Sequence, residues 1–161
     1  MLLEVENLSV TIGRVTPLDG VSFGLDRGQI LGLVGESGSG KSLTALAVTG
    51  LLPLIGGRVS GGAVRFQGKD LAGMKPAALR ALRGRRIGFV TQNPMTALDP
   101  VQRIGAQVDV VSRLHLGLSA GAARARTLDL LTQLRIPEAA AVCEAYPHQL
   151  SGGMKQRIVI A

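Results

Sequence analysis

Aromatic residues and cysteines are scarce in this sequence of 161 residues. Aromatic residues make up 2% of the chain, tryptophan is absent and Cys143 is the single cysteine. With so few aromatic faces, the chain lacks the stacking platforms by which many proteins bind single-stranded nucleic acid. One cysteine excludes an intramolecular disulfide framework and fits a reducing compartment. Because 46% of the residues are apolar, we expect a globular protein whose core consists of Leu, Val, Ile and Ala.

A long hydrophobic run is also missing. The longest apolar region, residues 43–55, is interrupted by two threonines, a glycine and a proline, whereas a membrane-spanning helix needs about 20 predominantly apolar residues. The first ten residues contain Glu4 and Glu6 and have no basic-then-apolar signal pattern. These absences predict a chain that is by itself soluble and cytoplasmic.

Acidic residues are outnumbered, and the excess of basic residues is concentrated in one stretch. The net charge is +7, and residues 69–86 hold six basic residues against the single acid Asp70, which gives +5. The six are Lys69, Lys75, Arg80, Arg83, Arg85 and Arg86. Such a cluster can bind nucleic acid, lie on an anionic membrane surface or simply be a solvated face, and the solvated face is the default.

Strands are expected mainly in the first half of the chain. Residues 1–25 predict antiparallel strands, because Val21, Phe23 and Leu25 alternate with small polar positions and residues 16–17 and 19–20 have turn chemistry. Residues 27–28 predict a further turn. Residues 30–34 and 87–91 are apolar without alternation, which is typical of parallel strands buried on both faces. A short strand is expected at residues 64–66.

Helical spacing dominates the second half. The apolar residues predict helices over residues 41–52, 75–83, 101–116 and 119–134, followed by a short alanine-rich helix that ends near residue 146. Ser151 is a candidate cap for a last helix that continues to the end of the sequence.

The strongest motif lies at residues 35–42, where Gly35, Gly40, Lys41 and Ser42 satisfy the pattern G-x-x-x-x-G-K-[ST]. Glycines allow several backbone N–H groups to point at one anion. Lys41 reaches the β- and γ-phosphates, Ser42 offers a hydroxyl to Mg²⁺, and the following helix turns its positive end toward the phosphates. The alternative is a glycine-rich turn that matches the pattern by chance. Such a match is expected in about one in a hundred chains of this composition. A predicted buried strand before the loop and a helix after it favour nucleotide binding.

Two further segments narrow the function. Gln92 follows the predicted strand at residues 87–91, and Ser151-Gly152-Gly153 begins the last predicted helix. Taken singly, a Ser-Gly-Gly run is also a plain helix cap, and a glutamine after a strand means little. In their order and separation from the phosphate loop, however, the segments resemble the nucleotide-binding domain of an ATP-binding cassette (ABC) transporter. Ser151-Gly152-Gly153 is similar to the signature motif of that family, and Gln92 to the glutamine of its Q-loop.

This resemblance implies an α/β fold of the P-loop NTPase class, the ABC-type nucleotide-binding domain. Such a domain has an N-terminal antiparallel β subdomain, a parallel core sheet with helices and a helical subdomain. In this chain we expect the β subdomain and phosphate-loop core at about residues 1–92, the helical subdomain at about 93–150 and the start of the signature helix at 151–161.

The resemblance also implies the site. ATP is expected to contact Gly35, Glu36, Ser37, Gly38, Ser39, Gly40, Lys41, Ser42 and Leu43 in one subunit and Ser151, Gly152 and Gly153 in its partner. Mg²⁺ is expected at Ser42 and Gln92. Lys41 and Gln92 are the expected catalytic residues.

The residues after Gln92 and those before Ser151 resemble one branch in particular, the bacterial importers of dipeptides, oligopeptides and nickel. That branch implies two such ATPases, identical or different, beneath transmembrane permease subunits. They lie peripherally on the cytoplasmic face of the inner membrane, and no direct contact with nucleic acid is expected. The alternatives are a soluble ABC-type ATPase acting on nucleic acid or ribosomes and a non-hydrolysing nucleotide-binding fragment.

Three features depart from the family pattern. No aromatic residue lies near Ile12 to stack on adenine, and Leu43 stands where many relatives have a hydroxyl. The sequence stops at Ala161, before the Walker B strand with its acidic pair, and Asp99 is not a substitute for that pair. We therefore expect a fragment in which residues 30–34 have an uncovered edge and which hydrolyses ATP barely or not at all.

Three further residues are assigned no catalytic role. His115 and His148 have no companions at metal-ligand spacing, and His148 is expected to be structural. Cys143 is expected to be a small buried apolar residue rather than a nucleophile.

Overall fold

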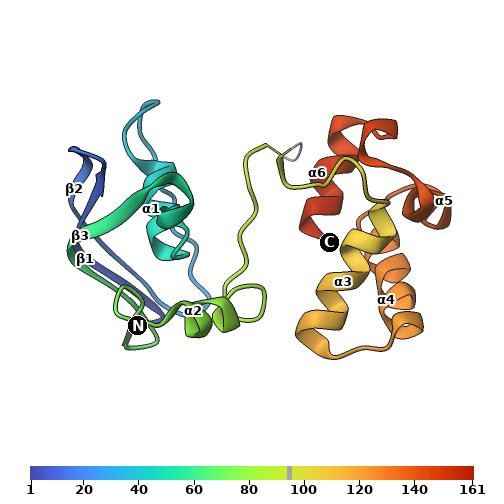
Figure 1. The fold of residues 1–161 in the computed structure, drawn as a ribbon, viewed down its shortest axis with the longest axis horizontal. Coiled ribbons are helices and arrows are strands. Elements are labelled where there is room, and N and C mark those ends of the chain that lie inside the picture. The colour runs from blue at the N-terminus through green and yellow to red at the C-terminus, as the bar shows by residue number, and fades with distance from the viewer. Residues whose placement is uncertain (94–95) are drawn as a thin grey trace. The chain divides into compact units, whose positions relative to one another are not determined.

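A four-stranded antiparallel sheet forms much of the first half of the protein (Figure 1). The structure is a computed structural model that describes residues 1–93 and 96–161. Its chain divides into two compact units, Met1–Ile87 and Gly88–Ala161. The three-part division expected from the sequence stays a prediction.

The sheet of the first unit has the order β2-β1-β3-β4. Its strands are β1 (Leu3–Ile12), β2 (Val15–Leu25), β3 (Gly57–Phe66) and β4 (Lys69–Asp70). The antiparallel pairing expected for residues 1–25 is confirmed. The turn lies at residues 13–14, where Ile12 pairs with Val15. The turns predicted at residues 16–17 and 19–20 are wrong, because the hairpin register places both pairs inside β2.

One face of this sheet carries the core of the first unit. Buried β-branched and leucine side chains from three strands meet the short helix α1 (Lys41–Val48), as the alternation of a half-buried sheet requires. The core residues are Val5, Leu8, Val10, Leu18, Ala47, Leu52, Val64 and Leu71. The unit also contains the 3₁₀ helix η1 (Leu52–Ile55) and helix α2 (Pro76–Leu82). The helix predicted at residues 41–52 ends four residues early, at Val48, and the left-handed Gly50 follows its C-cap residue Thr49.

The two predicted parallel strands are wrong. Residues 30–34 have no strand partner among the described residues, and the side chains of Ile30 and Val34 are 99% and 92% exposed. Residues 87–91 are likewise not a strand, apart from one isolated parallel bridge between Arg83 and Ile87. An apolar sequence favours a strand, but a strand needs neighbouring backbone to receive its hydrogen bonds.

The second unit is helical. It contains α3 (Ile104–Leu116), α4 (Ala120–Gln133), α5 (Ala139–Glu144), the 3₁₀ helix η3 (Pro147–Gln149) and α6 (Gly152–Ile160). The helices predicted in this region are confirmed, with ends that differ by a few residues. Their apolar faces enclose one core of Leu98, Ile104, Val108, Leu131, Ile136, Val142, Cys143 and Ile158. The expected burial of Cys143 is confirmed, since its side chain is fully buried and burial raises the pKa of its thiol.

An ion-pair network joins three helices of this unit. Arg124 on α4 donates to Asp109 on α3 at 2.9 Å and to Glu144 on α5 at 2.8 Å, and Arg103 also donates to Glu144. The hydroxyl of Thr127 donates to the other oxygen of Asp109 at 2.6 Å. Hydrogen bonds from Arg124 and Arg103 hold the pKa of the Glu144 carboxyl below its usual range. These ion pairs thus link α3, α4 and α5 at the edge of their shared apolar core.

In the part of the chain that the structure describes, no helix has both the length and the apolar character needed to cross a bilayer.

Candidate nucleotide-binding site

The glycine-rich loop of residues 35–42 lies between the extended residues 30–34 and helix α1. All its residues up to Ser39 are exposed, and it turns at residues 37–40 directly into the first turn of the helix. Glu36 accepts a backbone hydrogen bond from Ser39 at 3.2 Å, which closes the tip that contains Ser37 and Gly38. An open loop at a helix N-terminus presents unpaired backbone N–H groups to solvent, and such groups attract anions.

Lys41 is the one cation in this loop, and its ammonium group is held by the loop itself. Lys41 Nζ donates to the carbonyl of Gly35 at 2.7 Å, to that of Glu36 at 2.5 Å and to Ser39 Oγ at 3.2 Å. The structure therefore brings Gly35, Glu36, Ser39 and Lys41 together, and their expected contacts with ATP stay predictions. The charge of Lys41 thus lies within the loop, where a lysine and backbone N–H groups can act on the same anion.

Gly40 determines how the loop enters the helix. It is the N-cap residue of α1, it has φ of 89°, and no side-chain hydrogen bond caps the helix there. A Cβ atom at this position would lie 2.6 Å from Leu18 Cδ1 of strand β2. The hydroxyl of Thr44 donates to the Gly40 carbonyl at 3.0 Å. Leu18 and Thr44 thus support the site, yet sequence reasoning missed both because neither belongs to the motif pattern.

Ser42 and Leu43 occupy the first turn of α1. The side chain of Ser42 is exposed, whereas that of Leu43 packs partly against the core of the first unit. A single exposed serine hydroxyl next to Lys41 fits Mg²⁺, which prefers oxygen ligands and keeps several waters when it also binds phosphate. Leu43 can contribute only its backbone N–H to a phosphate, because its side chain is directed into the core.

The second predicted anion site lies at the start of α6, in the other unit. Ser151 is the N-cap of this helix, and its Oγ accepts a hydrogen bond from the Met154 N–H at 3.3 Å. Ser151, Gly152 and Gly153 are all exposed. The predicted cap is therefore confirmed, and the three residues form an uncharged surface of hydroxyl and backbone donors.

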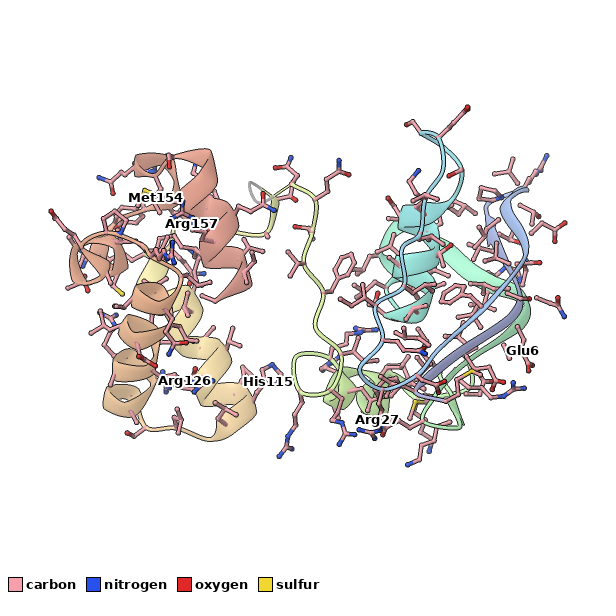
Figure 2. The ribbon with its side chains drawn as sticks, turned by 180° about the vertical axis from the view of Figure 1, so that it is seen from behind. Glu6, Arg27, His115, Arg126, Met154 and Arg157 are labelled. Carbon is pink, nitrogen blue, oxygen red and sulfur yellow. The ribbon has the colours of Figure 1, made fainter. Side chains whose placement is uncertain are left out.

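Helix α6 is held firmly behind that surface. Ile158 is buried in the core of the second unit, and Arg157 donates to the backbone carbonyl of Arg135 at 3.0 Å. Met154 and Arg157 both project from this helix (Figure 2). The Ser-Gly-Gly end of α6 thus belongs to a packed element.

Gln92 lies in the second unit, in an exposed bend before the helices. Its expected contact with Mg²⁺ and its catalytic role stay predictions. Pro94 and Met95, which belong to the segment that suggested the importer branch, lie outside the described residues.

Asp99 and His148 have local structural contacts. Asp99 accepts hydrogen bonds from the Val101 N–H at 3.0 Å and from Gln102 at 2.7 Å, which fixes the turn before α3. The ring of His148 stacks on that of Tyr146, with centroids 5.7 Å apart.

Comparison with known proteins identifies the class. The sequence pattern described as "ABC transporter" matches residues 18–161. The chain belongs to this family of ATP-binding cassette proteins.

Individual relatives are similar over the whole chain. A putative peptide import ATP-binding protein of Brucella abortus (strain 2308) is 46% identical over 99% of this chain and 49% of its own length. The oligopeptide transport ATP-binding protein of Bacillus subtilis (strain 168) is 41% identical over 99% of this chain and 46% of its own length. The chain therefore spans about half the length of the curated relatives it matches.

Solved structures share the fold. A dimeric post-hydrolysis ATP-binding cassette with ADP and phosphate bound has a TM-score of 0.84 over 98% of this chain and 67% of its own, at 24% identity. An ATP-binding subunit of an ABC transporter has a TM-score of 0.73 over 99% of this chain and 60% of its own, at 27% identity. The ABC-type α/β fold class expected from the sequence is confirmed, although the two core strands at residues 30–34 and 87–91 are not formed.

Proposed function

We propose that this protein binds ATP with Mg²⁺ at the loop of residues 35–42 and serves as the ATP-binding subunit of a bacterial peptide importer. The observation that carries the proposal is the position of Lys41. Its ammonium group is fixed by the carbonyls of Gly35 and Glu36 at the positive end of α1. Charge, loop amides and helix dipole then act together on the β- and γ-phosphates.

In this proposal the loop residues from Gly35 to Leu43 surround the triphosphate, and Ser42 and Gln92 would supply protein oxygens for Mg²⁺. The metal neutralises phosphate charge and polarises the bond that hydrolysis breaks. Gln92 orients the attacking water. Ser151, Gly152 and Gly153 contact the ATP held by a second ATPase subunit, because an uncharged hydroxyl-and-amide surface suits an anion that another loop already neutralises.

The peptide branch of the proposal rests on the relatives. Relatives 41% and 46% identical are named for oligopeptide transport and for peptide import. We propose accordingly that two permease subunits are partners, and that the protein lies peripherally on the cytoplasmic face of the inner membrane.

The alternative of a nucleic-acid-binding ATPase would rely on the basic cluster of residues 69–86, and the contacts of this cluster weaken that alternative. Arg83 donates to two backbone carbonyls, and Arg86 donates to Gln67 at 3.0 Å. Two of the six basic side chains are therefore engaged inside the first unit.

Calorimetric titration of the 161-residue chain with ATP and Mg²⁺ tests the binding step. We expect one site per chain, with affinity that falls when Mg²⁺ is chelated. Absence of heat and of any ATP-induced rise in melting temperature at millimolar ATP would contradict the proposal.

Co-purification of the protein from its own cells tests the assembly. We expect it to retain membrane permease subunits and to support peptide uptake in cells. Retention on nucleic acid at moderate salt, without permease subunits, would favour the alternative instead.

A further inference from the structure

Arg83 stands apart from the rest of the basic cluster because its side chain is half-buried and contacts helix α1. Arg83 Nε donates to the carbonyl of Thr49 at 2.8 Å, and Nη2 donates to the carbonyl of Gly50 at 2.6 Å. Both acceptors lie just beyond the C-terminal end of α1, whose other end carries Lys41 and Ser42.

The end of α1 is built to expose these two carbonyls. Gly50 has φ of 65°, its N–H donates to Ala47 O at 3.0 Å, and the Leu51 N–H donates to Leu46 O at 2.8 Å. This pair of bonds is the Schellman motif, which satisfies two of the last helical carbonyls and turns the chain sharply. Beyond Val48, the carbonyls of Thr49 and Gly50 accept the two hydrogen bonds from Arg83.

Charge makes this contact stronger than an ordinary cap. The last turn of α1 contains no basic residue of its own, and a cation near the negative end of a helix is favourable. Arg83 comes from the end of α2 (Pro76–Leu82) and supplies that cation from outside the helix. Its two hydrogen bonds also fix the orientation of the guanidinium group relative to the helix end, which a single point charge does not do.

Helix α1 is short, so what holds one end affects the other. Its eight residues span about 12 Å, and at the N-terminal end Gly40 lies against Leu18 without a side-chain cap. A change of tilt at Thr49 and Gly50 therefore displaces Lys41 and Ser42 relative to the loop amides.

We propose that Arg83 is a positioning residue for nucleotide binding, which holds the C-terminal end of α1 so that Lys41 and Ser42 are placed for the phosphates. The inference rests on the proposed binding of ATP at residues 35–42. It adds a residue that lies 42 positions beyond Lys41 in the sequence and outside every motif.

The test compares the affinity of the 161-residue chain and its variants for a fluorescent ATP analogue with Mg²⁺. We expect Arg83→Met to weaken binding about threefold to tenfold, because two charge-assisted hydrogen bonds at the helix end are lost. Arg83→Lys keeps the cation and one donor at a time, so it should recover part of the affinity. Arg85→Met removes an equal charge from an exposed neighbour and should bind as the unchanged chain does.

A second control separates positioning from loss of stability. Val64→Ala destabilises the same unit from its buried core, and its melting temperature can be matched to that of Arg83→Met. We expect Val64→Ala to retain wild-type affinity. Equal weakening by Val64→Ala, or wild-type affinity in Arg83→Met, would overturn the inference.

Each of the remaining possible results also supports or overturns the inference about Arg83. If Arg83→Met does not fold, Arg83→Lys alone is compared with the unchanged chain: weaker binding supports the inference, and equal binding overturns it. If the unchanged chain binds no nucleotide, the proposed function fails and this inference with it. If the unchanged chain binds and the Arg83 variants bind equally well, only this inference fails.

Discussion

Two helices of this protein, α1 and α6, present glycine-rich N-terminal ends to solvent, and they are built in different ways. Helix α1 begins after Gly40 without a side-chain cap and has Lys41 fixed by loop carbonyls. Helix α6 begins at Ser151, whose hydroxyl caps it, and the exposed Gly152 and Gly153 add no charge. A loop with its own cation is suited to hold a triphosphate alone. A neutral end is suited to an anion that is already bound elsewhere.

The largest expected effect comes from removing the cation that distinguishes the two ends. Lys41→Ala should weaken ATP binding by about 2–3 kcal/mol, or roughly 30- to 150-fold, because charge-assisted hydrogen bonds to phosphate are lost. Isothermal titration calorimetry measures the change. Lys69→Ala removes an exposed lysine outside the loop and serves as the matched control. Equal affinities for the two variants would mean that Lys41 does not contact the phosphates.

The second largest effect is expected at Gly40, the N-cap residue of α1, which has no side chain to cap the helix. Gly40→Ala introduces a Cβ atom at φ of 89° and 2.6 Å from Leu18 Cδ1. We expect the free energy of unfolding of the first unit to fall by about 1–3 kcal/mol, and ATP affinity to fall with it. Urea titration followed by circular dichroism reports the stability. Adding Leu18→Ala removes the close contact but not the backbone strain, so the double variant should recover affinity only in part. Wild-type stability in Gly40→Ala would show that the loop can join the helix with a different backbone conformation at residue 40.

Removing the cap of α6 should lower stability without changing how a single chain binds its own ATP. Ser151→Ala should lower the stability of the second unit by about 1 kcal/mol. At concentrations where the 161-residue chain is monomeric, its own affinity for ATP should stay unchanged, because Ser151 is proposed to contact only the ATP of a second subunit. Ser119→Ala is the matched control, since Ser119 caps α4 by accepting from the Ala122 N–H at 3.3 Å. A loss of ATP affinity in Ser151→Ala but not in Ser119→Ala would end the distinction between the two helix ends.

The smallest effect is a dependence on pH in the ion-pair network that joins α3, α4 and α5 in the second unit. Arginine contacts hold the pKa of Glu144 below its usual range in the folded state. Its stabilising contribution is therefore present above the unfolded pKa and is lost as the pH falls through the folded pKa. Glu144→Gln should melt at a lower temperature than the unchanged chain at pH 7, and the difference should close in acid. A difference that stays constant from pH 7 to pH 3 would contradict this assignment, as would a changed affinity for ATP.

Local sequence patterns predicted the helices of the second unit well, because each apolar face finds its partners within residues 96–161. Ser151 was readable as a cap from its type and place alone. Residues 30–34 and 87–91 were not readable in the same way. Their apolar runs predict strands, but pairing depends on backbone that is distant in the sequence.

The sequence alone was enough to recognise the phosphate-loop motif and the Ser-Gly-Gly run, because the chemistry of each depends only on the residue types in one short stretch. The tertiary structure decided what supports them. Leu18 lies against Gly40, and Arg83 reaches the end of α1, through contacts between elements that are far apart along the chain. No local pattern encodes such contacts, because they arise only when separate elements pack together.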